Sequence, residues 1–321
     1  MQFFADLSLR RNTKRTYSAH QRLFVQLCTG LRIDPRQPLS EQQLCLVIAA
    51  YTRDHKVTTV GGFVSALVNL AQSLGHPELP RSALYDRVRT GIDNYHANTN
   101  VSNPKHSITL SDLCAFYPHM QVSTFAGARD WCACLFAFFG LLRVNEYANG
   151  ALQTQHVQLQ EWGVRLTIPF SKTSLVPTQV ELVRRDDQLC PAQAWERYHA
   201  LMPLSGLSLP GDAVFITVSN NTIAPLTDRE FITRIRAVIV LAFNGTRDAA
   251  DFAGHSFRRG GASAMQLAGV PDSVIQTHGR WQSDAYRVYF DVQHSSDMRR
   301  LATSILRDRP PAPSTSAAPQ Q

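Results

Sequence analysis

Five short segments in the second half of the sequence gather side chains that bind phosphate, transfer protons or act as nucleophiles. They are Leu141–Glu146, Ser171–Thr173, His255–Gly261, Gly279–Trp281 and Tyr286–Tyr289. Arginine donates paired hydrogen bonds to phosphate oxygens, histidine and lysine transfer protons, and tyrosine can form a covalent intermediate. Each segment alone also has an ordinary structural explanation, so the interpretation depends on their joint order along the chain.

The first two segments place charged side chains in unusual surroundings. Arg143 and Glu146 directly follow a strongly apolar run, where a charged pair needs either a partner or a task. A salt bridge at a helix end would be the ordinary explanation. Lys172 lies in a turn after a predicted strand, where a lysine is ordinarily solvated.

The third segment predicts the start of a helix. His255 and Arg258 are three residues apart, so a helix that begins here presents both side chains on one face. Gly260 and Gly261 follow, and two glycines in a helix indicate close approach by another backbone, because they otherwise cost stability. The ordinary alternative is a histidine cap followed by a surface arginine, Arg259.

The last two segments are aromatic. Trp281 follows a glycine turn, and Tyr286 and Tyr289 are three residues apart, which places them on nearly the same face of a helix. Tryptophan and tyrosine in such contexts are more often core residues than catalytic ones.

The elements that must position these residues divide the chain into two domains and a tail. Residues 1–100 are predicted to be an all-helical domain, with a capping box that starts one helix at Ser40 and Gln43. Residues 101–308 are predicted to be a mainly α domain with a small β-sheet, which makes it an α+β domain. Residues 309–321 are rich in Pro, Ser, Ala and Gln and are expected to be disordered.

Individual elements follow from periodicity and from turn residues. Helices are expected over about 12–28, from 41, and over 58–74, 81–95, 110–117 and 126–142; strands are expected over 157–159, 164–169 and 178–183; from Pro191 onward the chain is expected to be mainly helical. Gly30 and the segment 34–38 are expected to break the first helix, and a linker is expected over 96–106.

Composition favours an anionic partner. The formal net charge is +7, which favours nucleic acid, and only four of the 32 basic residues are lysines. None of the six cysteines belongs to a C-x-x-C pair, so a structural zinc site is not expected. The sequence has no signal-peptide stretch and no run long enough to span a bilayer, so a soluble intracellular protein is expected.

Taken together, the order and spacing of seven residues resemble the active site of the tyrosine recombinases, also called the phage-integrase family. These residues are Arg143, Glu146, Lys172, His255, Arg258, Trp281 and Tyr289. The resemblance spans roughly 150 residues, and the helical first hundred residues resemble the family's N-terminal clamp domain. The sequence G-R-W-Q-S-D-A-Y-x-x-Y is most similar to recombinases of eukaryotic Crypton and DIRS mobile elements. The interval from Trp281 to Tyr289 is one residue shorter than in many phage and bacterial members, and Tyr286 is the rival nucleophile.

The resemblance implies a role for each of these residues. Two arginines, Arg143 and Arg258, would bind the non-bridging oxygens of the scissile phosphate, and Tyr289 would form a 3′-phosphotyrosyl link. His255, held or oriented by Glu146, would help to activate the Tyr289 phenol. The general acid would be Lys172, which would protonate the departing 5′-oxygen, and Trp281 would pack on the phosphate pocket and donate its indole N–H. No cofactor and no metal ion are implied.

The resemblance also implies partners. Double-stranded DNA is the expected substrate, bound by a homotetramer on two duplexes, with neither a membrane nor a small-molecule substrate involved. Basic residues expected to face DNA phosphates are Arg10, Arg11, Lys14, Arg15 and Arg259. The first four also fit a solvated helix face or a weak nuclear-import signal. A helix over 295–307 could be handed to a neighbouring protomer or could pack on its own domain.

Other functions stay open at this point. A type IB topoisomerase shares the phosphotyrosine chemistry but relaxes supercoils as a monomer. A catalytically inactive, domesticated DNA-binding protein would not need Lys172 or Tyr289, and a helical scaffold would leave the joint spacing unexplained. A eukaryotic origin would place the protein in the nucleus, and any other origin in the cytoplasm.

Overall fold

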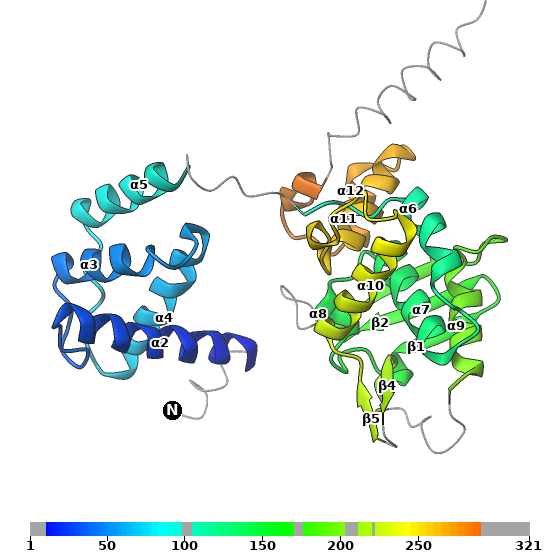
Figure 1. Cartoon of the computed structure of the whole chain (residues 1–321), viewed down its shortest axis with the longest axis horizontal. Helices are drawn as coiled ribbons and strands as arrows, with labels where there is room; N and C mark the ends of the chain where they lie inside the picture. Colours follow the sequence, from blue (N-terminus) through cyan, green and yellow to red (C-terminus); the bar gives the residue numbers. More distant parts are fainter. Residues whose placement is uncertain (1–10, 98–104, 170–175, 203–210, 220–221, 290–321) are drawn as a thin grey trace, which may run out of the picture. The chain divides into compact units, whose positions relative to one another are not determined.

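The computed structural model describes residues 11–97, 105–169, 176–202, 211–219 and 222–289 (Figure 1). The chain forms two compact units, Met1–Asn103 and Pro104–Gln321. Within the described ranges, every helix is too short or too polar to cross a lipid bilayer.

The N-terminal unit is helical, as the sequence predicts. It contains α2 (Arg11–Leu31), α3 (Glu41–Tyr51), the short 3₁₀ helix η1 (Val57–Thr59), α4 (Val60–Ser73) and α5 (Ala83–Ala97). The predicted capping box is present, because the Ser40 N–H donates to Gln43 Oε1 and the Gln43 N–H donates to Ser40 Oγ. The break predicted at Gly30 was wrong, since α2 continues to Leu31 and the chain turns at Arg32, where φ is +58°.

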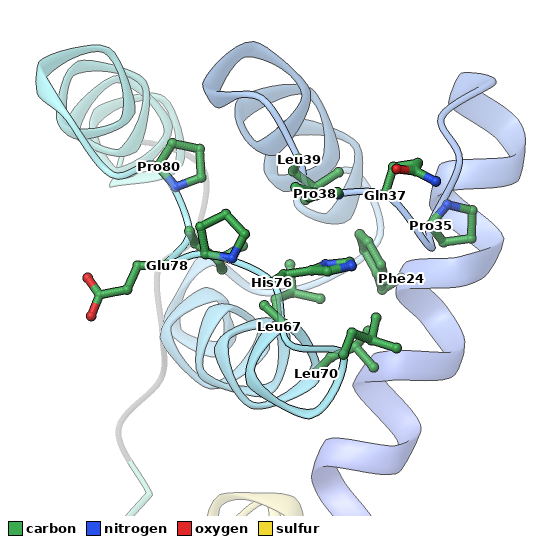
Figure 2. A pocket seen from close by; sticks show the side chains of 14 residues that line it. Phe24, Pro35, Gln37, Pro38, Leu39, Leu67, Leu70, His76, Glu78 and Pro80 are labelled. Carbon is green, nitrogen blue, oxygen red and sulfur yellow. The ribbon is translucent and has the colours of Figure 1, made fainter.

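An apolar pocket lies in this unit beside α2 and α4 (Figure 2). Phe24, Leu67 and Leu70 contribute to its lining, together with prolines of the neighbouring loops. Glu78 is the one acidic residue of the lining, and Figure 2 shows its carboxylate pointing outward. The lining also includes Gln37 and His76 but no arginine or lysine that could bind a phosphate.

The C-terminal unit contains the remaining described elements. They are α6 (Leu110–Phe116), η2 (Tyr117–His119), α7 (Phe125–Phe139), α8 (Val144–Tyr147), η3 (Thr154–His156), β1 (Val157–Gln160), β2 (Gly163–Ile168), β3 (Thr178–Val183), α9 (Pro191–Ala200), β4 (Ile216–Ser219), β5 (Thr222–Pro225), α10 (Asp228–Ala242), η4 (Ala249–Asp251), α11 (His255–Leu267), α12 (Asp272–His278) and η5 (Asp284–Tyr289).

The three predicted strands form one antiparallel sheet in the order β1-β2-β3. The middle strand buries Val164, Leu166 and Ile168, which alternate along it and face the core. A second, two-stranded sheet pairs β4 with β5. From Pro191 onward the described chain is mainly helical, as predicted, but the β4–β5 hairpin was not expected.

Helix α7 is the central element of this unit, and nearly all of its side chains are buried. Helices α9, α10 and α11 all contact it. The helix ends at Phe139, earlier than the predicted Leu142, because the chain turns at Leu141 with φ +46°.

Helix α11 packs tightly on this core, as its two glycines predict. A Cβ atom on Gly260 would lie 1.6 Å from the Ile108 carbonyl oxygen, and one on Gly261 would lie 2.1 Å from the Phe138 carbonyl oxygen. Only glycine fits at such distances. The close contact fixes the start of α11, which carries His255 and Arg258, against the end of α7.

Candidate functional site

The C-terminal end of α7 is where the predicted segments meet. The turn after α7 leads into α8, which begins next to Arg143, and α11 begins at His255. The turn after α12 carries Gly279, Arg280 and Trp281. Contacts between these three places bring most of the described candidate residues into one cluster.

Arg143 and Glu146 form the ion pair that the sequence suggests. Arg143 Nη1 lies 2.8 Å from Glu146 Oε1, and the Arg143 backbone N–H donates to Glu146 Oε2 over 2.9 Å. The side chain of Glu146 is 4% exposed, whereas that of Arg143 is 15% exposed. The carboxylate is thus buried behind an arginine that still reaches solvent.

Sequence reasoning missed a second partner of this carboxylate, Arg280. Its Nη2 lies 2.8 Å from Glu146 Oε2 and also donates to the Leu141 carbonyl, while its Nη1 donates to the carbonyls of Gly140 and His278. Its side chain is 5% exposed. In the sequence, the one sign of such a role was the position of Arg280 between Gly279 and Trp281.

The two arginines determine the protonation of Glu146. Burial by itself raises the pKa of the carboxyl group, but Arg280 and then the backbone and guanidinium N–H groups of Arg143 outweigh that effect. The pKa of Glu146 therefore lies below its ordinary value of 4.5, and the side chain is ionised at neutral pH.

Arg258 lies deeper than its predicted role suggests. The residue is fully buried, and its two Nη atoms donate to the carbonyls of Leu141 and Gly279. Its guanidinium carbon is 4.0 Å from the centroid of the Trp281 ring, a cation–π distance. Gly279 makes room for this ring, because a Cβ there would come within 1.6 Å of it.

His255 begins α11 and is exposed, although the surrounding protein removes part of its hydration. That desolvation, followed by the nearby charges of Arg258, Arg143 and Arg259, lowers the pKa of His255 below its ordinary value of 6.5, and Glu146 opposes the shift. The imidazole is therefore neutral at neutral pH. Glu146 hydrogen-bonds the two arginines, and no hydrogen bond between it and His255 is found among the described residues.

His278 is a further residue that sequence reasoning missed. Its Nε2 is 2.7 Å from the Phe139 carbonyl, and because a carbonyl only accepts, this nitrogen carries the proton. Burial lowers the pKa of His278, the Phe139 hydrogen bond opposes the shift, and Arg280 and Arg258 lower the pKa further. The carbonyls of residues 139 to 141 thus all accept from side chains of the site.

Of the two candidate tyrosines, Tyr286 is a core residue. Tyr286 is 2% exposed and packs with Leu141, Ala262 and Ile275 in a small core. Its hydroxyl hydrogen-bonds Asp272 over 3.3 Å. Tyr289 ends η5, and its side chain lies outside the described structure.

The remaining predicted residues are distributed elsewhere. Lys172 and Arg10 lie outside the described residues, as do the side chain of Arg11 and the segment 295–307. Lys14 and Arg15 are exposed on α2 of the other unit. Arg259 donates to the Lys105 carbonyl beside the start of α11.

The cluster has an excess of positive charge. It holds the guanidinium groups of Arg143, Arg258 and Arg280 against the single carboxylate of Glu146. Buried charges without counterions are costly, so the arrangement favours an anion at its exposed side, where Arg143 and His255 lie. In the described ranges no three histidine, cysteine or carboxylate residues gather as a metal site requires.

Comparison with known proteins identifies the fold. No protein-family profile and no curated protein sequence matches the chain. The Tn1549 transposon integrase in complex with circular intermediate DNA matches with a TM-score of 0.60 and 13% identity, over 92% of this chain and 94% of that one. A lambda integrase dimer bound to a COC′ core site matches with a TM-score of 0.58 and 16% identity, over 92% and 75%.

A third match is the XerH site-specific recombinase bound to palindromic difH substrate, with a TM-score of 0.58 and 16% identity over 84% of this chain and 73% of that one. At such identities these matches show the fold alone. The chain has the tyrosine-recombinase fold, which confirms the predicted fold class. The Crypton and DIRS resemblance stays a prediction.

Proposed function

We propose that this chain is a site-specific DNA recombinase that cleaves and rejoins strands through a 3′-phosphotyrosyl intermediate on Tyr289. The observation that carries the proposal is a cationic cluster in which Arg143 and Arg280 pair with Glu146, while Arg258 shares the Leu141 carbonyl with Arg280. The cluster lies where α8, α11 and the Gly279–Trp281 turn meet in a chain with the tyrosine-recombinase fold. A phosphodiester is an anion that gains charge in the transition state, and preorganised guanidinium donors stabilise that charge.

The proposed reaction conserves the number of phosphate ester bonds. The Tyr289 oxygen attacks the scissile phosphorus, the bond to the 5′-oxygen breaks, and Lys172 gives that oxygen a proton. His255 accepts the phenolic proton, a role that its lowered pKa suits because the ring is neutral at pH 7. A 5′-hydroxyl of another strand then reverses these steps, so rejoining needs neither ATP nor a metal ion.

The burial of Tyr286 supports the choice of Tyr289. Its hydroxyl is tied to Asp272 and its ring packs against Trp281 and Leu141. Using Tyr286 as the nucleophile would require that core to open.

The partners follow from the reaction. Double-stranded DNA is the substrate, and exchange between two duplexes calls for a homotetramer, with one active site for each exchanged strand. The Tn1549 integrase structure contains circular intermediate DNA, the XerH structure a palindromic difH substrate, and the lambda integrase structure a COC′ core site. The segment Gly279–Tyr289 resembles recombinases of Crypton and DIRS mobile elements, and this resemblance is the reason for proposing that the chain comes from a mobile element.

A suicide substrate tests the proposal. Duplex DNA that the full chain selects from a random-sequence library is nicked next to each candidate phosphate, so that cleavage releases a short fragment and traps the protein. Wild type should form an adduct that resists denaturation, in the presence of EDTA as in its absence. Tyr289→Phe should form none, whereas Tyr286→Phe, the matched control, should retain it.

Three other results would change the proposal. An adduct lost only in Tyr286→Phe would keep the reaction class and replace the nucleophile. Relaxation of supercoils by a monomer, without exchange between two site-bearing duplexes, would indicate a type IB topoisomerase. No adduct on any DNA that wild type binds tightly would leave an inactive DNA-binding protein.

A further inference from the structure

We propose that Arg280 is a positioning residue of the phosphate site, which holds Glu146 so that Glu146 in turn orients Arg143. The inference rests on the proposed function and goes beyond it, because Arg280 is none of the seven residues on which the resemblance is built. It is carried by one chain of contacts, from Arg280 Nη2 to Glu146 Oε2 and from Glu146 Oε1 to Arg143 Nη1, each 2.8 Å long.

The environment of Arg280 shows that its place is closely fixed. Its side chain is 5% exposed, and its two Nη atoms donate to three backbone carbonyls in addition to Glu146. Its φ is +58°, a left-handed conformation that non-glycine residues adopt at a cost in strain. The contacts with three carbonyls and with Glu146 hold the side chain inward in spite of this cost.

Glu146 passes this constraint to Arg143. One carboxylate oxygen accepts from Arg280 and from the Arg143 backbone N–H, and the other accepts from the Arg143 guanidinium. Without Arg280, burial would favour protonation of Glu146, since burial is the largest influence on its pKa and raises it. A neutral Glu146 would hold Arg143 less firmly, and misplacement of a phosphate donor slows the chemical step.

The alternative is that Arg280 only stabilises the fold, because it also connects the turn after α12 to the end of α7. A residue with only that role would slow the reaction solely through loss of folded protein. A positioning residue acts on the rate of cleavage at saturating DNA, while DNA affinity and the fraction of folded chain stay nearly constant. It also acts through Glu146, so its effect should not add to that of Glu146.

The experiment measures adduct formation on the suicide substrate, with the full chain in excess, for Arg280→Met, Arg280→Lys, Glu146→Gln and Arg280→Met combined with Glu146→Gln. We expect the rate constant to fall about 100-fold in Arg280→Met, with DNA affinity within about threefold of wild type. Arg280→Lys should recover part of the rate, because an ammonium can still pair with Glu146. The double variant should be no slower than the slower single variant.

Arg234→Met is the matched control. Arg234 also pairs with a buried carboxylate, Asp130, in the same unit, but at the other end of α7. It should cleave at the wild-type rate at a temperature where all variants are folded. Equal slowing of Arg234→Met and Arg280→Met, or additive losses in the double variant, would overturn the inference.

A second readout separates this inference from the proposed function. If wild type forms no adduct, the proposed function fails, but the carboxyl titration of Glu146 by ¹³C NMR still tests the contact. Its pKa should rise in Arg280→Met and stay at the wild-type value in Arg234→Met. An unchanged Glu146 pKa in Arg280→Met would overturn the inference whatever the activity.

Discussion

Helix α7 has a network of buried charges near each of its ends, and the two networks differ in their balance of charge. Near the N-terminal end, Arg129 and Arg234 flank Asp130, and Glu230 lies 3.8 Å from Arg129. Arg129 also donates to the carbonyl and hydroxyl of the β4 residues Ile216 and Thr217. Two arginines thus meet two carboxylates, and the network joins α7 to α10 and to the β4–β5 hairpin.

Near the C-terminal end, the balance is different. Arg143 and Arg280 both pair with Glu146, and Arg258 shares the Leu141 carbonyl with Arg280. The C-terminus of α7, which ends shortly before this carbonyl, carries a partial negative charge that favours cations nearby. It offsets only part of the excess, since the helix end is worth about half a charge.

The comparison separates a structural role from a functional one. In a balanced network the positive and negative side chains neutralise one another, so the network does not attract an ion from solvent. An unbalanced one retains a field that attracts an anion, and it does so where Arg143 reaches solvent. The largest predicted effect follows from removing that exposed cation.

Arg143→Ala should lower the rate of adduct formation by about 10²–10³-fold, the cost of removing one preorganised donor to a developing anion. Stability should change little, because Glu146 keeps its pair with Arg280 and Arg143 is partly exposed. Single-turnover cleavage and thermal unfolding of the same preparation measure the two effects. A variant that loses stability but cleaves normally once folded would show that this end of α7 is structural too.

The balanced end should respond in the opposite way. In Asp130→Asn the more distant Glu230 is the one carboxylate left to Arg129, which is 2% exposed. Breaking a buried ion pair in this way costs about 3 kcal/mol. Urea unfolding should show that loss, whereas the cleavage rate of the folded chain should stay near that of wild type.

The elements that a local pattern determines could be predicted from the sequence. Ser40 and Gln43 marked a helix start through their own side chains, and the same two residues form the capping box. Gly260 and Gly261 indicated a close backbone contact, although the sequence could not name its partners, Ile108 and Phe138. The strands of the first sheet followed from alternation.

The parts that depend on contacts between distant residues could not be predicted. Arg280 meets Glu146 across 134 positions of sequence, and its inward direction depends on a left-handed backbone that no local pattern indicates. The β4–β5 hairpin has mostly exposed positions, so it lacks the alternation that marks a half-buried strand. Arg129 stood within a run that predicts only a buried helix, because its partners lie on α10 and β4.

The smallest predicted effect concerns the proton at the unbalanced end. Desolvation and the charges of Arg258, Arg143 and Arg259 lower the pKa of His255, and Glu146 only partly opposes them. If neutral His255 accepts the phenolic proton, protonation must inactivate it, so the acid limb of the pH–rate profile should lie below pH 6.5. The cleavage rate should therefore fall by less than about twofold between pH 7.5 and 6.5.

His255→Gln should remove this acid limb, since glutamine does not titrate, while His119→Gln, a change at an exposed histidine of the same unit, should leave it in place. Glu146→Gln sharpens the comparison further. It removes the one negative charge that opposes the lowering of the His255 pKa, so the acid limb should move to still lower pH. An acid limb above pH 6.5 in wild type would mean that the cationic excess does not reach His255, because a surplus of positive charge cannot raise the pKa of an imidazole.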